Sequence, residues 1–244
     1  MTGIGNGAGS GLARDRLIVA LDMPGLPAAE ALVERLAGVV AHFKVGSTLF
    51  TAVGPAAVEM VRRRGGRVFL DLKYHDIPAT VAGAVAAAAR LGVGLLTVHA
   101  SGGAAMLRAA AEAARAAGRD RPRIVAVTVL TSLDRAALLR ELGVPIAVEG
   151  HAVHLAVLAR EAGCDGVVAS PREAGRLRSI LGPGALIVTP GIRLAGGAAH
   201  DQARIATPAA AIRAGADYLV VGRPITEAAD PAAAAAAILA EVPA

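Results

Sequence analysis

Short runs of apolar residues recur along the chain, each separated from the next by a longer alanine-rich stretch. Eight runs have the length of strands, and most are continuously apolar rather than alternating with polar residues. Continuous apolar runs are typical of parallel strands that are buried on both faces. We therefore predict strands over residues 17–21, 42–45, 68–72, 95–98, 124–129, 166–169, 186–189 and 218–221.

The stretches between these runs have the composition of helices. We predict helices over residues 28–37, 55–64, 80–91, 104–117, 151–162, 172–181, 203–214 and 231–239. Six of them are followed by a glycine, where helices commonly end in a left-handed residue. These glycines are Gly65, Gly92, Gly118, Gly163, Gly182 and Gly215.

Alternation of strand and helix is compatible with a closed barrel or with an open doubly wound sheet. Eight strands in 244 residues favour a single (β/α)8 TIM barrel. Residues 21–25, after the first strand, also lack the GxGxxG pattern of a dinucleotide-binding open sheet. In a barrel the carboxyl ends of all strands converge on one mouth, and the polar residues cluster at those ends. They are Asp22, Lys44, Asp71, Lys73, His99, Thr131, Ser132, Ser170, Arg193 and Arg223.

The chain shows no composition shift that would divide the barrel. We predict a disordered glycine-rich leader over residues 1–13 and one catalytic α/β barrel domain over residues 14–244. The leader lacks the apolar core of a signal peptide. The most apolar stretch, residues 81–100, is interrupted by Arg90 and is too weak for a membrane span. Together with the single cysteine, Cys164, these features predict a cytoplasmic protein without a membrane partner.

The formal net charge of +5 comes mainly from arginine. A nucleic-acid site would need basic residues clustered on one face and interleaved with aromatic residues. Aromatic residues form only 2% of the chain. The densest basic cluster, residues 62–64 with Arg67, lies at a predicted helix C-terminus, where cations complement the helix dipole. We therefore expect no nucleic-acid partner.

The two lysines stand out from this arginine-rich background. Of the 25 basic residues, only Lys44 and Lys73 are lysine, and both lie at predicted strand C-termini. Arginine does not readily release a proton, whereas an ammonium is compact and can donate one. We infer that both positions need an ammonium group and that at least one needs its transferable proton.

Carboxylates accompany the lysines. Residues two apart in an extended strand point to the same face, so Asp71 and Lys73 should both face the mouth. Asp76 follows where the loop turns. Alternation of these two carboxylates with the ammonium groups of Lys44 and Lys73 would keep all four ionised. A salt-bridge network that only stabilises the fold is the alternative, although it would more naturally lie at the other end of the barrel.

A fixed carboxylate beside an ammonium suits a substrate that loses a negative group and leaves a carbanion. Asp71 would crowd the departing carboxylate, and Lys73 would stabilise the carbanion and then protonate it. One such donor supplies about 3–4 kcal/mol. A vinylic carbanion needs far more, so binding energy from remote substrate groups must also act at the reacting centre. This requirement predicts a phosphate site.

The segments after the last two predicted strands suit phosphate. Gly191 and Arg193 follow the seventh strand, and Gly222 and Arg223 follow the eighth. These two loops commonly bind phosphate in such barrels, and arginine grips it with two donors. The long loop 194–202 could close as a lid and bring Gln202 to the phosphate. Solvated arginines and ordinary loop disorder are the alternatives.

Two other pairs carry weaker signals. His151 and His154 have a spacing that can bind metal, but no carboxylate or cysteine completes a site near them, so we expect no metal site. Ser170 and His99 could suggest a nucleophile and its base, but neither lies in a nucleophile-elbow sequence.

Seven segments resemble the orotidine 5′-phosphate decarboxylase family, in the same order and over nearly the whole chain after the leader. The third segment is the most specific. The segments are Ala20-Leu21-Asp22, Phe43-Lys44-Val45-Gly46, Asp71-Leu72-Lys73-Tyr74-His75-Asp76-Ile77-Pro78-Ala79-Thr80, Val98-His99-Ala100-Ser101-Gly102-Gly103, Leu130-Thr131-Ser132, Pro190-Gly191-Ile192-Arg193 and Val221-Gly222-Arg223-Pro224-Ile225.

The resemblance implies decarboxylation of orotidine 5′-monophosphate to uridine 5′-monophosphate (UMP) and CO2, the last step of de novo pyrimidine biosynthesis, without metal or cofactor. It implies that Lys73 donates the proton and that Asp71 presses on the substrate carboxylate. Lys44 would bind the ribose and orient Asp71, and Asp22 would hold a ribose hydroxyl.

The resemblance also implies the remaining substrate contacts and a homodimer. Asp76 and Thr80 would reach the active site of the neighbouring subunit. The other implied contacts are Thr131 and Ser132 with the pyrimidine, and Arg193, Gln202, Gly222 and Arg223 with the phosphate.

Two alternatives stay open at this point. One is a magnesium-dependent enzyme resembling 3-keto-L-gulonate 6-phosphate decarboxylase, which shares an Asp-x-Lys-x-x-Asp pattern. The continuation His-Asp-Ile-Pro-x-Thr at residues 75–80, the Leu-Thr-Ser segment and Gln202 argue against it. The other is a phosphometabolite-binding barrel without catalysis, against which the intact Lys73 argues.

Overall fold

The computed structural model describes residues 13–194 and 206–243. Its parallel strands form a closed barrel in which each strand pairs with its neighbours in sequence and β1 pairs with β8. The strands are β1 (Leu17–Ala20), β2 (His42–Gly46), β3 (Arg67–Tyr74), β4 (Leu95–His99), β5 (Arg123–Val127), β6 (Gly166–Val168), β7 (Leu186–Thr189) and β8 (Tyr218–Val221). The predicted (β/α)8 barrel is therefore confirmed, and each strand boundary differs from its predicted position by at most two residues.

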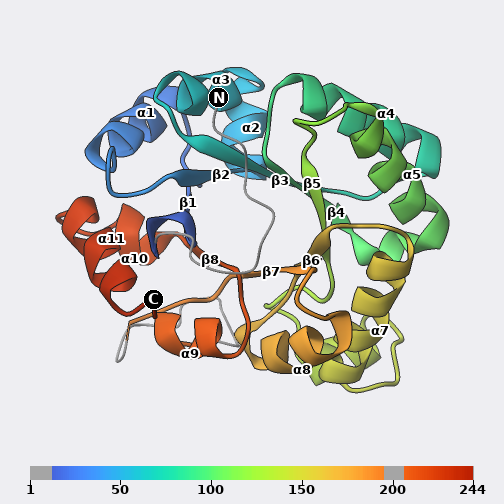
Figure 1. The fold of residues 1–244 in the computed structure, drawn as a ribbon. Helices are drawn as coiled ribbons and strands as arrows, with labels where there is room; N and C mark the ends of the chain where they lie inside the picture. Colours follow the sequence, from blue (N-terminus) through green and yellow to red (C-terminus); the bar gives the residue numbers. More distant parts are fainter. Residues whose placement is uncertain (1–12, 195–205, 244) are drawn as a thin grey trace.

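A ring of helices surrounds the strands (Figure 1). The helices are α1 (Leu26–Arg35), α2 (Ser47–Val53), α3 (Ala56–Arg63), α4 (Pro78–Arg90), α5 (Gly103–Ala116), α6 (Arg135–Arg140), α7 (Val148–Glu161), α8 (Pro171–Leu181), α9 (Pro208–Arg213), α10 (Arg223–Thr226) and α11 (Pro231–Ala240), with two 3₁₀ turns, η1 (Ala13–Asp15) and η2 (Ala100–Gly102). The prediction missed α2, α6 and α10, which have seven, six and four residues and are too short to display a helical period.

Successive strand residues point into two separate apolar regions. Ile18 and Ala20 of β1 pack inside the barrel with Phe69 and Val125, whereas Val19 packs in the layer between strands and helices. Because both faces of each strand are buried, the apolar runs are continuous.

Glycine ends the helices where the sequence indicated. All six glycines predicted there have positive φ, from 71° at Gly92 to 105° at Gly215. At Gly215 a Cβ would also lie 2.8 Å from the Cβ of Arg178, so the close packing of α8 on this turn favours glycine as well.

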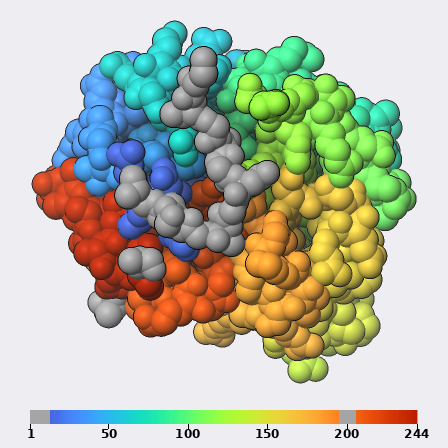
Figure 2. Space-filling view, in the orientation of Figure 1, coloured from blue at the N-terminus to red at the C-terminus, as the bar shows by residue number. Residues whose placement is uncertain are grey.

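The chain closes on itself around the barrel axis. In Figure 2 the colours succeed one another around the molecule, and the blue N-terminal segments lie beside the red C-terminal ones. Ala13, the last residue of the predicted leader, begins η1, and the remaining leader residues lie outside the described residues. Among the helices that the structure describes, none is both long enough and apolar enough to cross a membrane.

The basic cluster at residues 62–64 lies at the C-terminal end of α3, as predicted. Arg64 forms ion pairs with Glu30 and Glu34 of α1 at 2.7 and 2.6 Å. Arg62 donates to the carbonyl of Leu91. These arginines therefore bind neighbouring turns and helices of the same chain.

Candidate active site

A pocket of about 520 Å³ lies at the mouth where the carboxyl ends of the strands converge. This volume is in the range of small-molecule sites. Nine of the predicted site residues line it together: Asp22, Lys44, Asp71, Lys73, Thr131, Ser132, Arg193, Gly222 and Arg223. The structure thus brings into one cavity residues from both ends of the chain.

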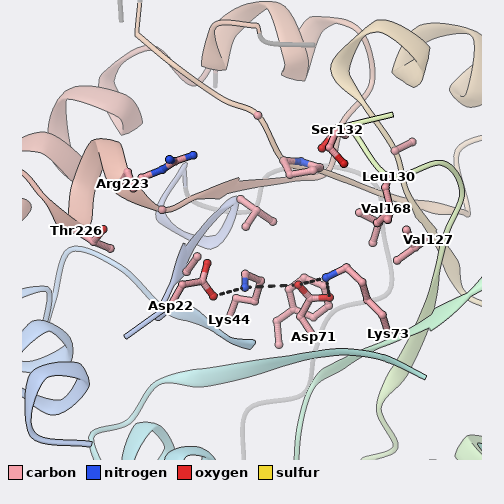
Figure 3. Close-up of a pocket in the computed structure, with 18 of the residues that line it drawn as sticks. Asp22, Lys44, Asp71, Lys73, Val127, Leu130, Ser132, Val168, Arg223 and Thr226 are labelled. Carbon is pink, nitrogen blue, oxygen red and sulfur yellow. Dashed lines mark hydrogen bonds and ion pairs between the residues drawn. The ribbon is translucent and has the colours of Figure 1, made fainter. Parts of the chain in front are cut away.

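Charged groups form a row along one wall of the pocket (Figure 3). The Nζ atom of Lys44 lies 2.8 Å from Asp22 Oδ1 and 3.5 Å from Asp71 Oδ2. The Nζ atom of Lys73 lies 3.0 Å from each oxygen of Asp71. The row therefore alternates in sign in the order Asp22, Lys44, Asp71, Lys73.

The pairing of adjacent strands produces this row. Ala20 pairs with Lys44, and Gly46 pairs with Asp71, so the ends of β1, β2 and β3 lie side by side. Gly46 has room for no side chain here, because a Cβ would lie 2.7 Å from both Asp22 Oδ1 and Lys44 Nζ. Gly46 is a site residue that sequence reasoning did not single out, although it lies within the Phe43-Lys44-Val45-Gly46 segment.

The alternation keeps Asp71 ionised although it is buried. Burial by itself raises the pKa of the Asp71 carboxyl, but the charges of Lys44 and Lys73 and the hydrogen bonds from Lys73 and Thr97 lower it below its ordinary value. The side chains of Lys44 and Asp71 are only 11% and 10% exposed, whereas that of Lys73 is 36% exposed. Lys73 is thus the ammonium that is open to a molecule in the pocket.

Strand alternation alone does not explain how Asp71 and Lys73 come to face the same cavity. Lys73 has φ of 51° and is the only non-glycine residue with positive φ in the described part of the chain. The pairing of β3 with β4 shifts between Leu70 and Tyr74. The prediction that both side chains line the pocket is confirmed, but the extended geometry on which it relied ends at Lys73.

Two arginines, Arg193 and Arg223, also line the pocket. Arg193, which is buried, follows β7, and Arg223 begins α10 directly after β8. Burial and the nearby charge of Arg223 lower the pKa of the Arg193 guanidinium. Two guanidinium groups that repel each other in a partly buried place form a site that an anion would stabilise.

Apolar side chains line one side of the pocket. Val127, Leu130 and Val168 lie near Ser132 in Figure 3, and Arg223 lies at the other side of the view. A flat ring could contact the apolar side chains while its polar edge meets Thr131 and Ser132. The pocket therefore has a polar-edged apolar end, a charged wall and a cationic end.

Two of the predicted residues, Asp76 and Thr80, do not line this pocket in the described chain. Asp76 and Thr80 are exposed, and Asp76 Oδ1 accepts a hydrogen bond from the N–H of Ile77 at 2.6 Å. Within one chain the fourth charge of the row is therefore Asp22 rather than Asp76. Gln202 and the predicted lid from residue 195 onward lie outside the described residues.

The other weak candidates have structural explanations. Ser170 and Glu173 form a capping box at the start of α8, and His99 packs against His75 at 5.5 Å between ring centres. Neither Ser170 nor His99 lines the pocket. His151 and His154 stack on each other on α7, and no group of potential metal ligands occurs among the described residues.

Sequence reasoning also missed Thr97 and Glu227. Thr97 is fully buried on β4 and is hydrogen-bonded to Asp71 and to the backbone of Lys73. A threonine within an otherwise apolar strand run was the only signal for it. Glu227 lines the pocket one residue beyond α10, a helix that was not predicted.

Comparison with known proteins gives consistent matches over the whole barrel. A family model described as "Orotidine 5'-phosphate decarboxylase / HUMPS family" matches residues 15–238. A protein of Moorella thermoacetica named orotidine 5′-phosphate decarboxylase is 60% identical over 234 residues, which cover 94% of this chain and 93% of that protein. A protein of the same name from Halorhodospira halophila is 58% identical over 227 residues, covering 93% of this chain and 95% of that protein.

Solved structures agree with these matches. The crystal structure of orotidine 5′-phosphate decarboxylase from Lactobacillus acidophilus superimposes with a TM-score of 0.84 at 37% identity, covering 94% of this chain and all of that one (100%). An uncharacterized conserved protein from Geobacillus kaustophilus gives a TM-score of 0.81 at 41% identity, covering 92% of this chain and 99% of that one.

Proposed function

The chain belongs to the orotidine 5′-phosphate decarboxylase / HUMPS family, and we propose that it converts orotidine 5′-monophosphate to UMP and CO2. It is a carboxy-lyase that acts in pyrimidine biosynthesis. One observation carries the assignment of the chemistry: a row of alternating charges, Asp22, Lys44, Asp71 and Lys73, lies along one wall of a single pocket.

We propose that Asp71 and Lys73 perform the chemical step. Asp71 is held ionised and buried, so its charge repels the substrate carboxylate beside it. The bond between C6 of the pyrimidine and the carboxylate carbon breaks, CO2 leaves, and the electron pair stays on C6. Lys73 stabilises that pair and transfers a proton from Nζ to C6, which gives UMP, and water then reprotonates Lys73.

Lys44 and Asp22 are proposed to hold the ribose. Lys44 is ion-paired to Asp22 at 2.8 Å and lies 3.5 Å from Asp71, so one ammonium can link a sugar hydroxyl to the catalytic carboxylate. The side chain of Asp22 lines the pocket, is 54% exposed and can accept a hydrogen bond from a ribose hydroxyl.

The two ends of the pocket suit the two ends of a nucleotide. We assign the pyrimidine edge to Thr131 and Ser132. We assign the phosphate to the guanidinium groups of Arg193 and Arg223 and to the backbone of Gly222. Gln202, which lies outside the described residues, is proposed as a further phosphate contact. Phosphate binding at a distance from C6 supplies binding energy that the reacting centre can use.

We propose that the active enzyme is a homodimer with shared sites. Asp76 and Thr80 lie on an exposed segment just beyond the pocket strand β3, and Ile77 between them is 66% exposed. Because this segment is exposed, it is accessible to a second subunit. In that arrangement Asp76 and Thr80 complete the site of the neighbouring subunit.

We further propose that the enzyme acts in the cytoplasm.

No metal or cofactor takes part in the proposed mechanism, because the protein's own ammonium supplies both charge stabilisation and the proton. The direct test adds orotidine 5′-monophosphate to EDTA-treated protein and follows the loss of its ultraviolet absorbance. We expect full turnover, unchanged by added magnesium. Activity that needs magnesium would favour a decarboxylase resembling the 3-keto-L-gulonate 6-phosphate enzyme. Saturable UMP binding without CO2 release would favour a non-catalytic barrel.

A further inference from the structure

The backbone of β3 leaves its regular course at the catalytic lysine. Leu70 pairs with Leu96 and Tyr74 pairs with Val98, so four steps along β3 face two steps along β4. The irregularity contains Lys73, whose φ of 51° lies in the left-handed region that side chains rarely adopt. Something must hold the chain in this conformation.

The hydroxyl of Thr97 on β4 occupies the centre of the irregularity. It accepts a hydrogen bond from the backbone N–H of Lys73 at 2.8 Å and donates one to Asp71 Oδ1 at 3.0 Å. Thr97 is fully buried between Leu96 and Val98. A single hydroxyl therefore uses both its acceptor and its donor, and no apolar side chain of the same shape could replace it.

These two bonds link the position of one catalytic group to the backbone of the other. Asp71 Oδ1 is held by Thr97 and Lys73, and Oδ2 by Lys73 and Lys44. Loss of the Thr97 hydroxyl would leave Oδ1 with one donor fewer and the Lys73 N–H without its acceptor. The carboxylate could then rotate, and the backbone at Lys73 could relax toward an extended conformation.

We propose that Thr97 is a positioning residue for the decarboxylation, an inference that rests on the function proposed above. It does not line the pocket. Its hydroxyl orients the Asp71 carboxylate and fixes the left-handed turn that places the Lys73 ammonium. Misplacement of a reacting group by about 1 Å can lower a rate by about 100-fold, so a small relaxation here has a large kinetic effect.

The test compares Thr97→Val, which keeps the branched shape, with Thr97→Ser, which keeps the hydroxyl. We expect Thr97→Val to lower kcat by about 10- to 100-fold while KM and UMP affinity change by less than about threefold. Thr97→Ser should stay within about threefold of the wild-type kcat. The acid limb of the kcat profile should also move to higher pH in Thr97→Val, because the Asp71 carboxylate loses a donor that favours its ionised form.

Thr189→Val is the matched control. Thr189 is another fully buried threonine, at the end of β7, but its hydroxyl has no hydrogen-bond partner in the described structure. The kcat of the Thr189→Val variant should equal that of the wild type. If Thr97→Val does not fold, Thr97→Ala takes its place, with the same split between kcat and UMP affinity expected.

Three outcomes would overturn the inference: wild-type kcat in the variant without the hydroxyl, an equal loss in Thr97→Ser, or an equal loss in Thr189→Val. Failure of the proposed function is a separate result, because it would appear as wild-type protein that binds UMP but does not release CO2.

Discussion

The ammonium nitrogen of Lys73 lies 3.0 Å from each carboxylate oxygen of Asp71, although a single residue separates them along β3. Such a symmetrical pair keeps a buried carboxylate ionised. It also keeps a proton donor within reach of a substrate group that lies beside this carboxylate. The substrate carboxylate would have to come close to Asp71 in order to meet Lys73. In this geometry Asp71 repels the carboxylate of the bound substrate, and Lys73 stabilises the carbanion that forms when CO2 leaves.

Replacement of Lys73 by alanine should abolish turnover while product binding persists. Loss of a general acid that also stabilises the carbanion should lower kcat by at least about 1,000-fold. UMP affinity, measured by calorimetry, should stay measurable because phosphate and ribose contacts are intact. Lys73→Arg is the matched variant and should also be inactive, since its guanidinium retains the charge but does not release a proton. Substantial activity in either variant would contradict the proton-donor role.

Removal of the Arg223 side chain should weaken phosphate binding specifically. A hydrogen bond to a charged group contributes about 1.5–3 kcal/mol, so Arg223→Ala should raise the KM for orotidine 5′-monophosphate and the Kd for UMP by about 10- to 100-fold. The affinity for uridine, which has no phosphate, should not change. Arg213→Ala, on the exposed surface of α9, serves as the control for lost positive charge. Equal weakening of uridine and UMP would remove the phosphate assignment.

Gly46→Ala should disturb the charged row without unfolding the barrel. The φ of −94° at Gly46 is accessible to alanine, but the new Cβ would lie 2.7 Å from both Asp22 Oδ1 and Lys44 Nζ. Both side chains must move, so kcat/KM should fall by about 10- to 100-fold with little change in Tm. Gly150→Ala on α7, where a Cβ would meet nothing within 4 Å, should leave kcat/KM unchanged. Wild-type kinetics in Gly46→Ala would show that the Asp22–Lys44 pair tolerates displacement.

Mixtures of two inactive variants should regain activity if sites are shared between subunits. Asp76→Ala and Lys73→Ala homodimers should each be inactive, whereas a mixed dimer contains one site with both residues intact. After subunit exchange of equal amounts, about a quarter of the wild-type sites should be restored. Mass spectrometry of the intact dimers would establish that exchange has occurred. Exchanged but inactive mixtures would argue against the contribution of Asp76 across the interface.

Acid should destabilise the barrel through His42, at the opposite end of the strands from the pocket. Burial, assisted by the charges of Arg67 and Arg123, lowers the pKa of His42 to about 4 in the folded protein. Between about pH 6.5 and pH 4 the unfolded chain therefore binds this proton more readily than the folded chain. As pH falls through this window, His42 should remove about 3 kcal/mol of stability.

Denaturant titrations at pH 6.5 and pH 4.5 would measure this effect. The free energy of unfolding should fall less between pH 6.5 and pH 4.5 in His42→Gln than in the wild type. In His154→Gln, which replaces an exposed histidine on α7, it should fall as much as in the wild type. If His42→Gln loses as much stability as the wild type, another group causes the acid sensitivity.

The sequence by itself determined the architecture and most of the pocket. Continuous apolar runs such as residues 186–189 indicated parallel strands buried on both faces, and eight of them indicated a closed barrel. The rarity of lysine identified Lys44 and Lys73. These inferences succeed because the apolar character of a run and the chemistry of a side chain are present in the local sequence.

The tertiary structure alone decided how these groups meet. The pairing of β1 with β2, and of β2 with β3, places Asp22 rather than Asp76 at the end of the charged row within one chain. The left-handed turn at Lys73 and its hydrogen bond to Thr97 depend on β4, 24 residues away along the chain. Distances between side chains on separate strands follow from barrel closure and register, which no local pattern of residues encodes.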